Sequence, residues 1–350
     1  MRQKKGKILY IYTADATFVQ RDIEMLSKKF QVVTHSFYHK KKRYLFFLFL
    51  KEFFFLLKNI WRSKGVITMF GGYHSFLPSV FSKLFNKKNY IILGGTDCVS
   101  FPSINYGNFR KQPYAWFTKW SYKLSTHLLP VHESLIFYNY TYYDSDFSTQ
   151  GCKAFCPDLQ TPYTVIYNGF DSTFWRKEPS LEKRNNQFVT IASMRSDTII
   201  KLKGIDLILK IAERFPECTF HIVGVRKDVQ IPAAVSNVKF HPFADAIGLR
   251  NILSESRFYL QLSISEGFPN ALCEAMLCEC VPIGSRVGGI PTIIGNTGKI
   301  LEKRDLFLLE SILKEILSEP DLTELGRKAR SRVAEEFTFQ KREQKLIELF

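Results

Sequence analysis

The sequence predicts an α/β protein built from two doubly wound parallel sheets in tandem. Short apolar runs rich in β-branched and aromatic residues alternate with longer helical patterns along most of the chain, which is typical of βαβ units. The length of 350 residues exceeds one ordinary core, and a hydrophobic content of 45% excludes a disordered chain. The turn signal Asn168-Gly169 separates two such series and predicts the boundary between two domains.

The expected strands fall into two series. The first comprises residues 7–12, 31–37, 65–70, 90–94, 128–131 and 164–167. The second comprises residues 188–192, 219–223, 238–241, 258–262 and 281–284, with helices centred near residues 208, 249, 275 and 313. We therefore expect one domain over residues 1–168, a second over residues 169–337, and a C-terminal helix over residues 338–350.

The net charge of +16 is concentrated in the first domain. Residues 1–168 carry 23 Lys and Arg against 9 Asp and Glu, or +14, whereas residues 169–350 carry 26 against 24, or +2. This asymmetry predicts a polyanionic partner for the first domain, either anionic lipid headgroups or nucleic acid. The sequence has no RNP, KH or zinc-finger pattern, so a nucleic-acid-binding protein is only an alternative and no nucleic acid partner is expected.

The cysteines and the N-terminus indicate a reducing compartment. Seven cysteines are scattered without paired metal-type spacings, which favours free thiols. No signal-peptide pattern opens the chain, so we expect a cytoplasmic protein. No metal site is expected: Asp144-Ser145-Asp146 has DxD spacing without a preceding buried strand, and Cys152 and Cys156 lack a second ligand pair.

The segment from Tyr44 to Trp61 is unusually rich in Phe and Leu and follows a basic run at residues 40–43. As a helix it would carry one narrow polar stripe, formed by Lys51, Glu52, Lys58, Asn59 and Arg62. Two charges at its centre argue against a transmembrane span. Two alternatives stay open: a helix buried in the core, and a helix lying in a membrane interface with its basic flanks at the headgroups.

The stretch from Ser263 to Met276 carries the clearest functional pattern. A strand ends, a polar loop turns at Gly267, and Pro269-Asn270 opens a helix. The first amides of this helix, at Asn270, Ala271 and Leu272, would point at the carboxyl edge of the sheet, where anionic ligands bind in doubly wound folds.

Glu266 in this loop and Glu274 in the helix are both able to face that crevice. Carboxylates beside an anion site are expected to accept hydrogen bonds from hydroxyls, such as the diols of a sugar or ribose. For Glu274 the structural alternative is a favourable position near a helix N-terminus. A glycoside hydrolase with two carboxylates is the competing function, but the anion site favours a nucleotide ligand.

Several motifs, in order over about residues 163–340, resemble the retaining glycosyltransferases of the GT-B type known as family four or group 1. They are residues 266–276 (EGF followed by EAM), residues 280–291, the hinge-like residues 165–171 and the KGID run at residues 203–206. The resemblance implies two Rossmann-like domains facing across a cleft. The first would bind the acceptor and the second the nucleotide sugar, with the C-terminal helix packing back toward the first domain.

The resemblance also implies roles for single residues in donor binding. Glu274 would bind the ribose hydroxyls, Glu266 the transferred sugar, and Lys203 the diphosphate, with Gly267 and the amides of residues 270–272 completing the site. In the family an arginine precedes the lysine, and Arg195 is its substitute here, with a surface charge as the alternative.

Asp97 is the catalytic candidate in the first domain. It follows the strand at residues 90–94, where relatives place a His or Asp near the reacting carbon. An Asx turn or a helix cap is the alternative role.

The resulting prediction is a metal-independent enzyme that moves a sugar from a nucleotide diphosphate sugar to an acceptor hydroxyl with retention of configuration. No cofactor besides the donor is expected. The acceptor would be a glycan or lipid-linked glycan in surface polysaccharide synthesis, and the basic first domain would contact an anionic membrane surface at its inner face. A GT-B enzyme of another kind, such as a sugar-nucleotide epimerase or a phosphorylase, is the alternative.

Overall fold

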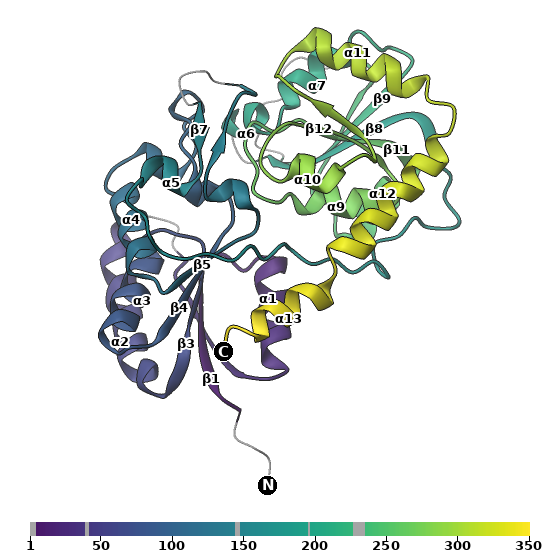
Figure 1. The fold of residues 1–350 in the computed structure, drawn as a ribbon. Helices are drawn as coiled ribbons and strands as arrows, with labels where there is room; N and C mark the ends of the chain where they lie inside the picture. The colour runs from purple at the N-terminus through teal and green to yellow at the C-terminus, as the bar shows by residue number, and fades with distance from the viewer. Residues whose placement is uncertain (1–4, 39–41, 144–147, 195–196, 227–234) are drawn as a thin grey trace. The chain divides into compact units, whose positions relative to one another are not determined.

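The computed structural model describes residues 5–38, 42–143, 148–194, 197–226 and 235–350 (Figure 1). The chain divides into two compact units. Unit 1 comprises Met1–Asn139, Thr149–Asn168 and Gln340–Phe350, and unit 2 comprises Tyr140–Ser148 and Gly169–Phe339. Each unit contains one large parallel sheet flanked by helices, so the predicted α/β class is confirmed.

The sheet of unit 1 has the strand order β2-β1-β3-β4-β5. Its strands are β1 (Lys7–Tyr12), β2 (Gln31–Ser36), β3 (Ser63–Met69), β4 (Lys88–Leu93) and β5 (His127–Pro130). All neighbouring pairs are parallel, with Tyr10 opposite both Thr34 and Ile67. Residues 8–11 of β1 are fully buried, as expected for a strand covered by helices on both faces.

The helices of unit 1 cover both faces of this sheet. On one face, α2 (Leu45–Asn59), α3 (Tyr73–Leu84) and α4 (Tyr114–Leu124) lie side by side (Figure 1). On the other lie α1 (Thr17–Ser27) and the C-terminal α13 (Phe339–Ile347). The reversal of strand order between β1 and β2 explains this, because right-handed crossovers then place α1 opposite α2. Short helical turns complete the unit: Lys42–Tyr44, Ile60–Arg62, Thr96–Cys98, Pro102–Ile104, Asn108–Arg110, Glu133–Leu135 and α5 (Cys152–Phe155).

A buried ion pair fastens α13 to α1 within unit 1. The Arg342 guanidinium donates to both carboxylate oxygens of Asp22 at 2.6 and 2.7 Å and also to the carbonyls of Ile166 and Tyr167. The Tyr10 hydroxyl donates to the same carboxylate at 3.2 Å. The end of the chain is therefore part of the first unit.

The sheet of unit 2 has the strand order β10-β9-β8-β11-β12-β13. Its strands are β8 (Arg184–Met194), β9 (Thr219–Val225), β10 (Val238–His241), β11 (Ser256–Gln261), β12 (Val281–Ser285) and β13 (Lys299–Leu301). Its helices are α6 (Asp197–Leu202), α7 (Ile205–Ala212), α8 (Ala246–Glu255), α9 (Asn270–Leu277), α10 (Ile290–Ile294), α11 (Leu306–Leu317) and α12 (Leu322–Glu336). Phe188 stacks against Phe220 and Phe258 in the core, at centroid distances of 4.9 and 4.6 Å.

The structure corrects the strand predictions at three places. The expected strand at residues 164–167 is wrong, because the segment forms no regular strand: it has an isolated bridge between Leu128 and Tyr163, and the Thr164 and Ile166 amides donate to carbonyls of β5 at 3.0 Å. The three-residue β13 is too short for its periodicity to stand out in the sequence. A hairpin of β6 (Tyr138–Asn139) and β7 (Thr149–Gln150) interrupts unit 1, and Tyr140 beyond β6 donates to the Ile264 carbonyl at 2.9 Å within unit 2.

All seven cysteines lie in the described part of the chain, and each is a buried free thiol. None of the helices in the described ranges is long and apolar enough to cross a membrane.

Candidate active site

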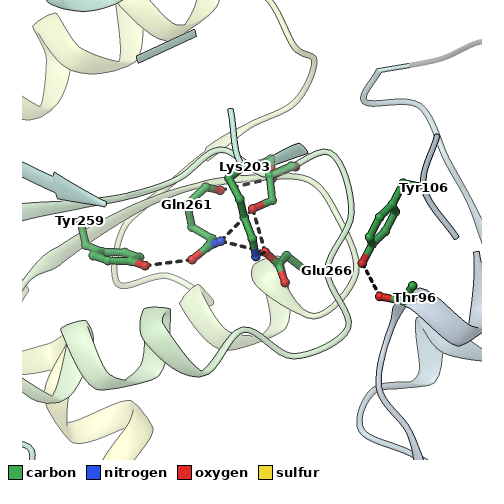
Figure 2. Close-up of polar contacts among 8 residues, drawn as sticks. Thr96, Tyr106, Lys203, Tyr259, Gln261 and Glu266 are labelled. Atoms are coloured by element: carbon green, nitrogen blue, oxygen red, sulfur yellow. Dashed lines mark hydrogen bonds and ion pairs between the residues drawn. The ribbon is translucent and has the colours of Figure 1, made fainter. Parts of the chain in front are cut away.

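A carboxylate with three hydrogen-bond donors lies at the carboxyl end of β11 in unit 2 (Figure 2). Oε1 of Glu266 accepts from Lys203 Nζ at 2.5 Å, from Ser263 Oγ at 2.8 Å and from Gln261 Nε2 at 3.0 Å. Only 13% of the Glu266 side chain and 27% of the Lys203 side chain are exposed. Two of the predicted site residues are thus brought into direct contact.

The second oxygen of Glu266 is available for a ligand. All three donors converge on Oε1, and among the described residues none bonds to Oε2. A carboxylate oxygen held in this way is oriented in advance and accepts a hydrogen bond from a hydroxyl at little conformational cost.

Strand periodicity explains how β11 and its extension supply these donors. Tyr259, Gln261 and Ser263 alternate with apolar residues, so their side chains leave the same face of the strand. The Tyr259 hydroxyl donates to Gln261 Oε1 at 3.1 Å, and Gln261 Nε2 also donates to Ser263 Oγ at 2.8 Å. Sequence reasoning missed these three residues, although polar side chains at period two in a buried strand were a usable signal.

A left-handed turn places Lys203 in the site. Lys203 follows α6, and Gly204 has a φ of 71° and starts α7. A Cβ on Gly204 would come within 2.3 Å of the Leu262 carbonyl oxygen, so only glycine allows this approach. The Ile264 amide donates to the Leu202 carbonyl at 2.8 Å, which fixes the lysine turn against the loop that carries Glu266.

A second glycine supports Glu266 from the other side. Gly288, in the turn after β12, has a φ of 53°, and a Cβ there would lie 1.9 Å from the Glu266 carbonyl oxygen. The Gly289 amide donates to the Gly267 carbonyl at 2.9 Å. Gly288 and Gly289 thus hold the turn after β12 against the backbone of the loop that carries Glu266.

Helix α9 begins directly after this loop. Pro269 occupies the position before the helix, and its side chain offers no acceptor, so the amides of Asn270, Ala271 and Leu272 receive no cap from it. Asn270 and Glu274 are half-buried. Glu274 is the fifth residue of α9, about one turn beyond its start, and the helix has no acidic residue in its first turn. A helix start of this kind favours an anion.

The remaining unit 2 predictions lie partly outside the described residues. Arg195 falls there, as do Asp144 and Asp146 of the DxD-like run. Among the residues that the structure describes, no three His, Cys, Asp or Glu side chains group in a way that could hold a metal ion.

Asp97 belongs to unit 1, where it holds loops together. Its buried carboxylate accepts from the amides of Gly71, Gly94 and Gly95 at 2.9, 3.1 and 2.9 Å, and from the Tyr122 hydroxyl at 2.9 Å. Burial raises the pKa of Asp97, and these hydrogen bonds oppose the rise. The geometry is that of a positioning residue that ties the start of α3 to the end of β4 and to α4.

Comparisons with known sequences point to one family. The sequence family described as "Glycosyl transferases group 1" matches residues 185–319. N-acetyl-alpha-D-glucosaminyl L-malate synthase of Bacillus anthracis is 28% identical over 199 residues, which are 53% of this chain and 51% of that protein. The gpi3 component of phosphatidylinositol N-acetylglucosaminyltransferase from Schizosaccharomyces pombe is 25% identical over 142 residues, which are 37% and 30% of the two chains. The alignments thus span about half or less of these relatives.

Solved structures show the GT-B fold over nearly the whole chain. Sucrose-phosphate synthase from Thermosynechococcus elongatus has a TM-score of 0.71 at 12% identity, covering 99% of this chain and 98% of that one. HepE of Anabaena, in complex with UDP-glucose, has a TM-score of 0.67 at 13% identity and covers 98% of both chains. The predicted fold is therefore confirmed.

Proposed function

We propose that this chain, whose residues 185–319 belong to the glycosyl transferases of group 1, transfers a sugar from a nucleotide diphosphate sugar to an acceptor hydroxyl with retention of configuration and without a metal ion. The observation that carries the proposal is the cluster of Lys203 and Glu266 at the carboxyl end of β11, next to the start of α9. It combines a cation and helix amides for a diphosphate with a carboxylate for sugar hydroxyls.

The leaving group accounts for the cationic part of this site. When the glycosidic bond to the diphosphate breaks, negative charge develops on the phosphate oxygens, and preorganised donors stabilise it most effectively. Lys203 has three N–H donors and uses one for Glu266, so two remain for phosphate oxygens. The amides of residues 270–272 would share the charge, with Arg195 as a further cation.

The carboxylates account for sugar recognition. Oε2 of Glu266 would accept from a hydroxyl of the transferred sugar, and Glu274 from the ribose hydroxyls. The acceptor hydroxyl would attack from the face that the diphosphate leaves, which retains the configuration. Asp97 would act through the loops it holds in unit 1.

The relatives suggest which substrates to test first. Two of them carry N-acetylglucosaminyl or glucosaminyl in their names, and HepE was solved with UDP and with UDP-glucose. We therefore infer that UDP-N-acetylglucosamine is the first donor to test. The word phosphatidylinositol in the name of one relative, together with the basic first domain, favours a lipid-linked acceptor at the inner face of a membrane.

Donor binding tests this proposal directly. A bound donor raises the unfolding temperature because it binds only the folded protein. One of the UDP-, GDP- or ADP-sugars should raise it, and Glu274→Ala should weaken that binding at least tenfold, since a charge-assisted hydrogen bond contributes about 1.5 to 3 kcal/mol. Glu302→Gln, in the exposed Arg286–Glu302 pair, is the matched control. Full binding by Glu274→Ala would exclude its assigned role.

Product analysis separates transfer from the alternatives. A transferase releases nucleotide only when acceptor is present, whereas an epimerase interconverts sugar nucleotides without acceptor. The anomeric coupling in the NMR spectrum of the product then reports retention or inversion. Loss of activity on treatment with EDTA would contradict the metal-independent mechanism.

A further inference from the structure

Helix α2 exposes a stripe of large apolar side chains. Phe47, Leu50, Phe54 and Leu57 recur at helical spacing of three and four residues, and Trp61 continues the stripe after the helix. They are 66, 40, 62, 42 and 61% exposed, and neighbouring Phe46 is 67% exposed. Exposed apolar groups gathered in a patch of this kind mark an interaction site rather than ordinary surface.

The opposite side of α2 faces the core of unit 1. Glu52, Leu56 and Ile60 recur every four residues and are fully buried. The predicted polar stripe is therefore wrong as a single stripe, because Glu52 lies on the buried side while Lys51, Lys58 and Arg62 are exposed. The core alternative for the whole segment also fails, since full burial would not leave the Phe47 to Trp61 stripe exposed.

The charges around the exposed stripe are of one sign. Three cations run beside the apolar stripe, each directly after one of its residues in the sequence: Lys51, Lys58 and Arg62, at intervals of seven and four residues. Over helices α2, α3 and α4, all of whose residues the structure describes, Glu52 is the only acidic residue. The exposed charged side chains of these three helices are thus all basic, and one of them, Lys123 of α4, pairs with Asp158 outside the helices.

Helix α4 repeats the same combination. Trp116 and Trp120 are 45 and 39% exposed, their rings lie 6.1 Å apart, and Lys119 and Lys123 alternate with them at the same four-residue interval. Aromatic contacts join α4 to α2: Phe117 of α4 lies 5.8 Å from Phe49 of α2. The two helices therefore belong to one aromatic layer, which includes α3 (Figure 1).

We propose that the α2–α4 layer of unit 1 docks on an anionic lipid bilayer, with the Phe47 to Trp61 stripe entering the boundary between headgroups and acyl chains. The inference extends the membrane part of the proposed function and is independent of the transfer chemistry. Phe, Leu and Trp gain from leaving water at this depth, and lysines and arginines at their side meet the lipid phosphates. Tryptophan is enriched at this level of a bilayer.

The composition of the surface favours lipid over a macromolecular partner. A nucleic-acid site would place its cations along a groove with aromatic rings interleaved for base stacking. Here aliphatic Leu50 and Leu57 share the stripe with the phenylalanines, and the cations flank it. Protein interfaces are depleted of lysine relative to the rest of the surface, and two of the three cations beside the stripe are lysines.

Vesicle partition of the full chain tests the inference. Sedimentation with vesicles of phosphatidylcholine containing about 30% phosphatidylglycerol should retain the protein, and pure phosphatidylcholine should retain at least tenfold less. Phe47→Gln with Phe54→Gln, which keeps the net charge, should weaken partition at least tenfold. Lys51→Gln with Lys58→Gln should weaken it about tenfold and flatten its salt dependence. Phe307→Gln, an equally exposed phenylalanine in unit 2, should leave partition unchanged.

Each outcome decides the inference. Unchanged partition in the double phenylalanine variant, or no binding of the wild-type chain to anionic vesicles, would overturn it. Light scattering that shows a dimer abolished by the same variant would assign the stripe to a second copy instead and would also overturn it. Donor binding by thermal shift should be equal in all these variants, so a failure of the proposed enzyme activity is detected separately.

Discussion

Glu266 in unit 2 is a largely buried glutamate, and Glu52 in unit 1 is a fully buried one. Oε1 of Glu266 has three donors, from Lys203, Ser263 and Gln261. Neither oxygen of Glu52 has a hydrogen-bond partner among the described residues. Burial raises the pKa of Glu52 well above its ordinary value.

The difference in hydrogen-bond donors between the two glutamates follows from the elements that surround them. At the carboxyl end of a parallel sheet, neighbouring strands and turns bring polar side chains together, so a carboxylate there has hydrogen-bond donors and is positioned for a ligand. In α2 the glutamate lies on the core side, while phenylalanines occupy the side that could have been solvated. We infer that α2 keeps a glutamate without hydrogen-bond partners on its core side because its outer side is apolar, as membrane docking requires.

The largest effect is expected at the buried ion pair of Asp22 and Arg342. It is a third kind of buried carboxylate, one that is paired with a cation. Arg342→Met would leave Asp22 buried without its cation and should lower the free energy of unfolding by about 3–5 kcal/mol. Chemical denaturation measures this. The control is Lys28→Met, which breaks the more exposed Lys28–Glu343 pair of the same two segments and should cost less than about 1 kcal/mol. Equal costs for both variants would show that burial does not distinguish the two pairs.

Neutralising Glu266 tests the role of the carboxylate that has hydrogen-bond donors. Glu266→Gln should lower kcat/KM for sugar transfer about 10²–10³-fold, because the amide cannot accept as a charged group and leaves Lys203 unpaired. Steady-state kinetics with the sugar nucleotide that raises the unfolding temperature measures the effect. Glu302→Gln should change kcat/KM less than twofold. A loss confined to KM would place Glu266 in ground-state binding only.

Replacing Glu52 tests the cost of a buried carboxylate that has no hydrogen-bond partner. Glu52→Leu should raise the free energy of unfolding at pH 7 by about 1–3 kcal/mol, because it removes a buried polar group without partners. The folded-state pKa of Glu52 is raised, so its stability contribution is fully present below the pKa of the unfolded chain, about 4.3, and is lost as pH rises through the folded value.

The wild type should therefore lose stability relative to Glu52→Leu as pH rises above about 4.3. Denaturation at pH 5, 7 and 9 gives this difference. A difference independent of pH would mean that Glu52 does not titrate in this range, and a destabilised variant would contradict the absence of a partner.

The smallest expected effect concerns the positioning of Glu266. Gln261→Leu removes one of three donors and should lower kcat about tenfold, equivalent to about 1.4 kcal/mol, with little change in nucleotide affinity. Tyr259→Phe removes the bond to Gln261 Oε1 and a hydrogen bond with the Ile191 backbone, but none of the three donors to Glu266, and should have a weaker effect in the same direction. If Gln261→Leu instead weakened nucleotide binding with kcat intact, its role would be structural support of the loop.

Most of the strands could be predicted from the sequence, because buried parallel strands are short apolar runs bounded by polar turns. The predicted bounds of β1 and β10 match the structure residue for residue. The contact of Lys203 with Glu266 was foreseeable only through the family resemblance, since 63 residues separate them. The hydrogen bonds around Asp97 join residues 71, 94–95 and 122, and no local pattern encodes such a meeting.

The orientation of α2 could not be predicted for a different reason. Its circumference is almost entirely apolar, so hydrophobic periodicity gives no preferred inner side. Packing against β3 and α3 decides it: Leu56 and Ile60 fill the space beside Leu9 and Val66, and Phe55 packs against the edge of this cluster. Charge alone would have placed Glu52 outside with Lys51.

The close approach of Gly288 to the carbonyl of Glu266 has a consequence for redesign. No side chain fits between them, so the turn after β12 and the loop after β11 are mechanically coupled. A library meant to alter sugar preference by shifting Glu266 should vary both segments together while leaving Gly288 fixed. A variant that shifts only one segment would bring its backbone into a clash with the other segment. Such variants would misfold and could not show a new sugar specificity.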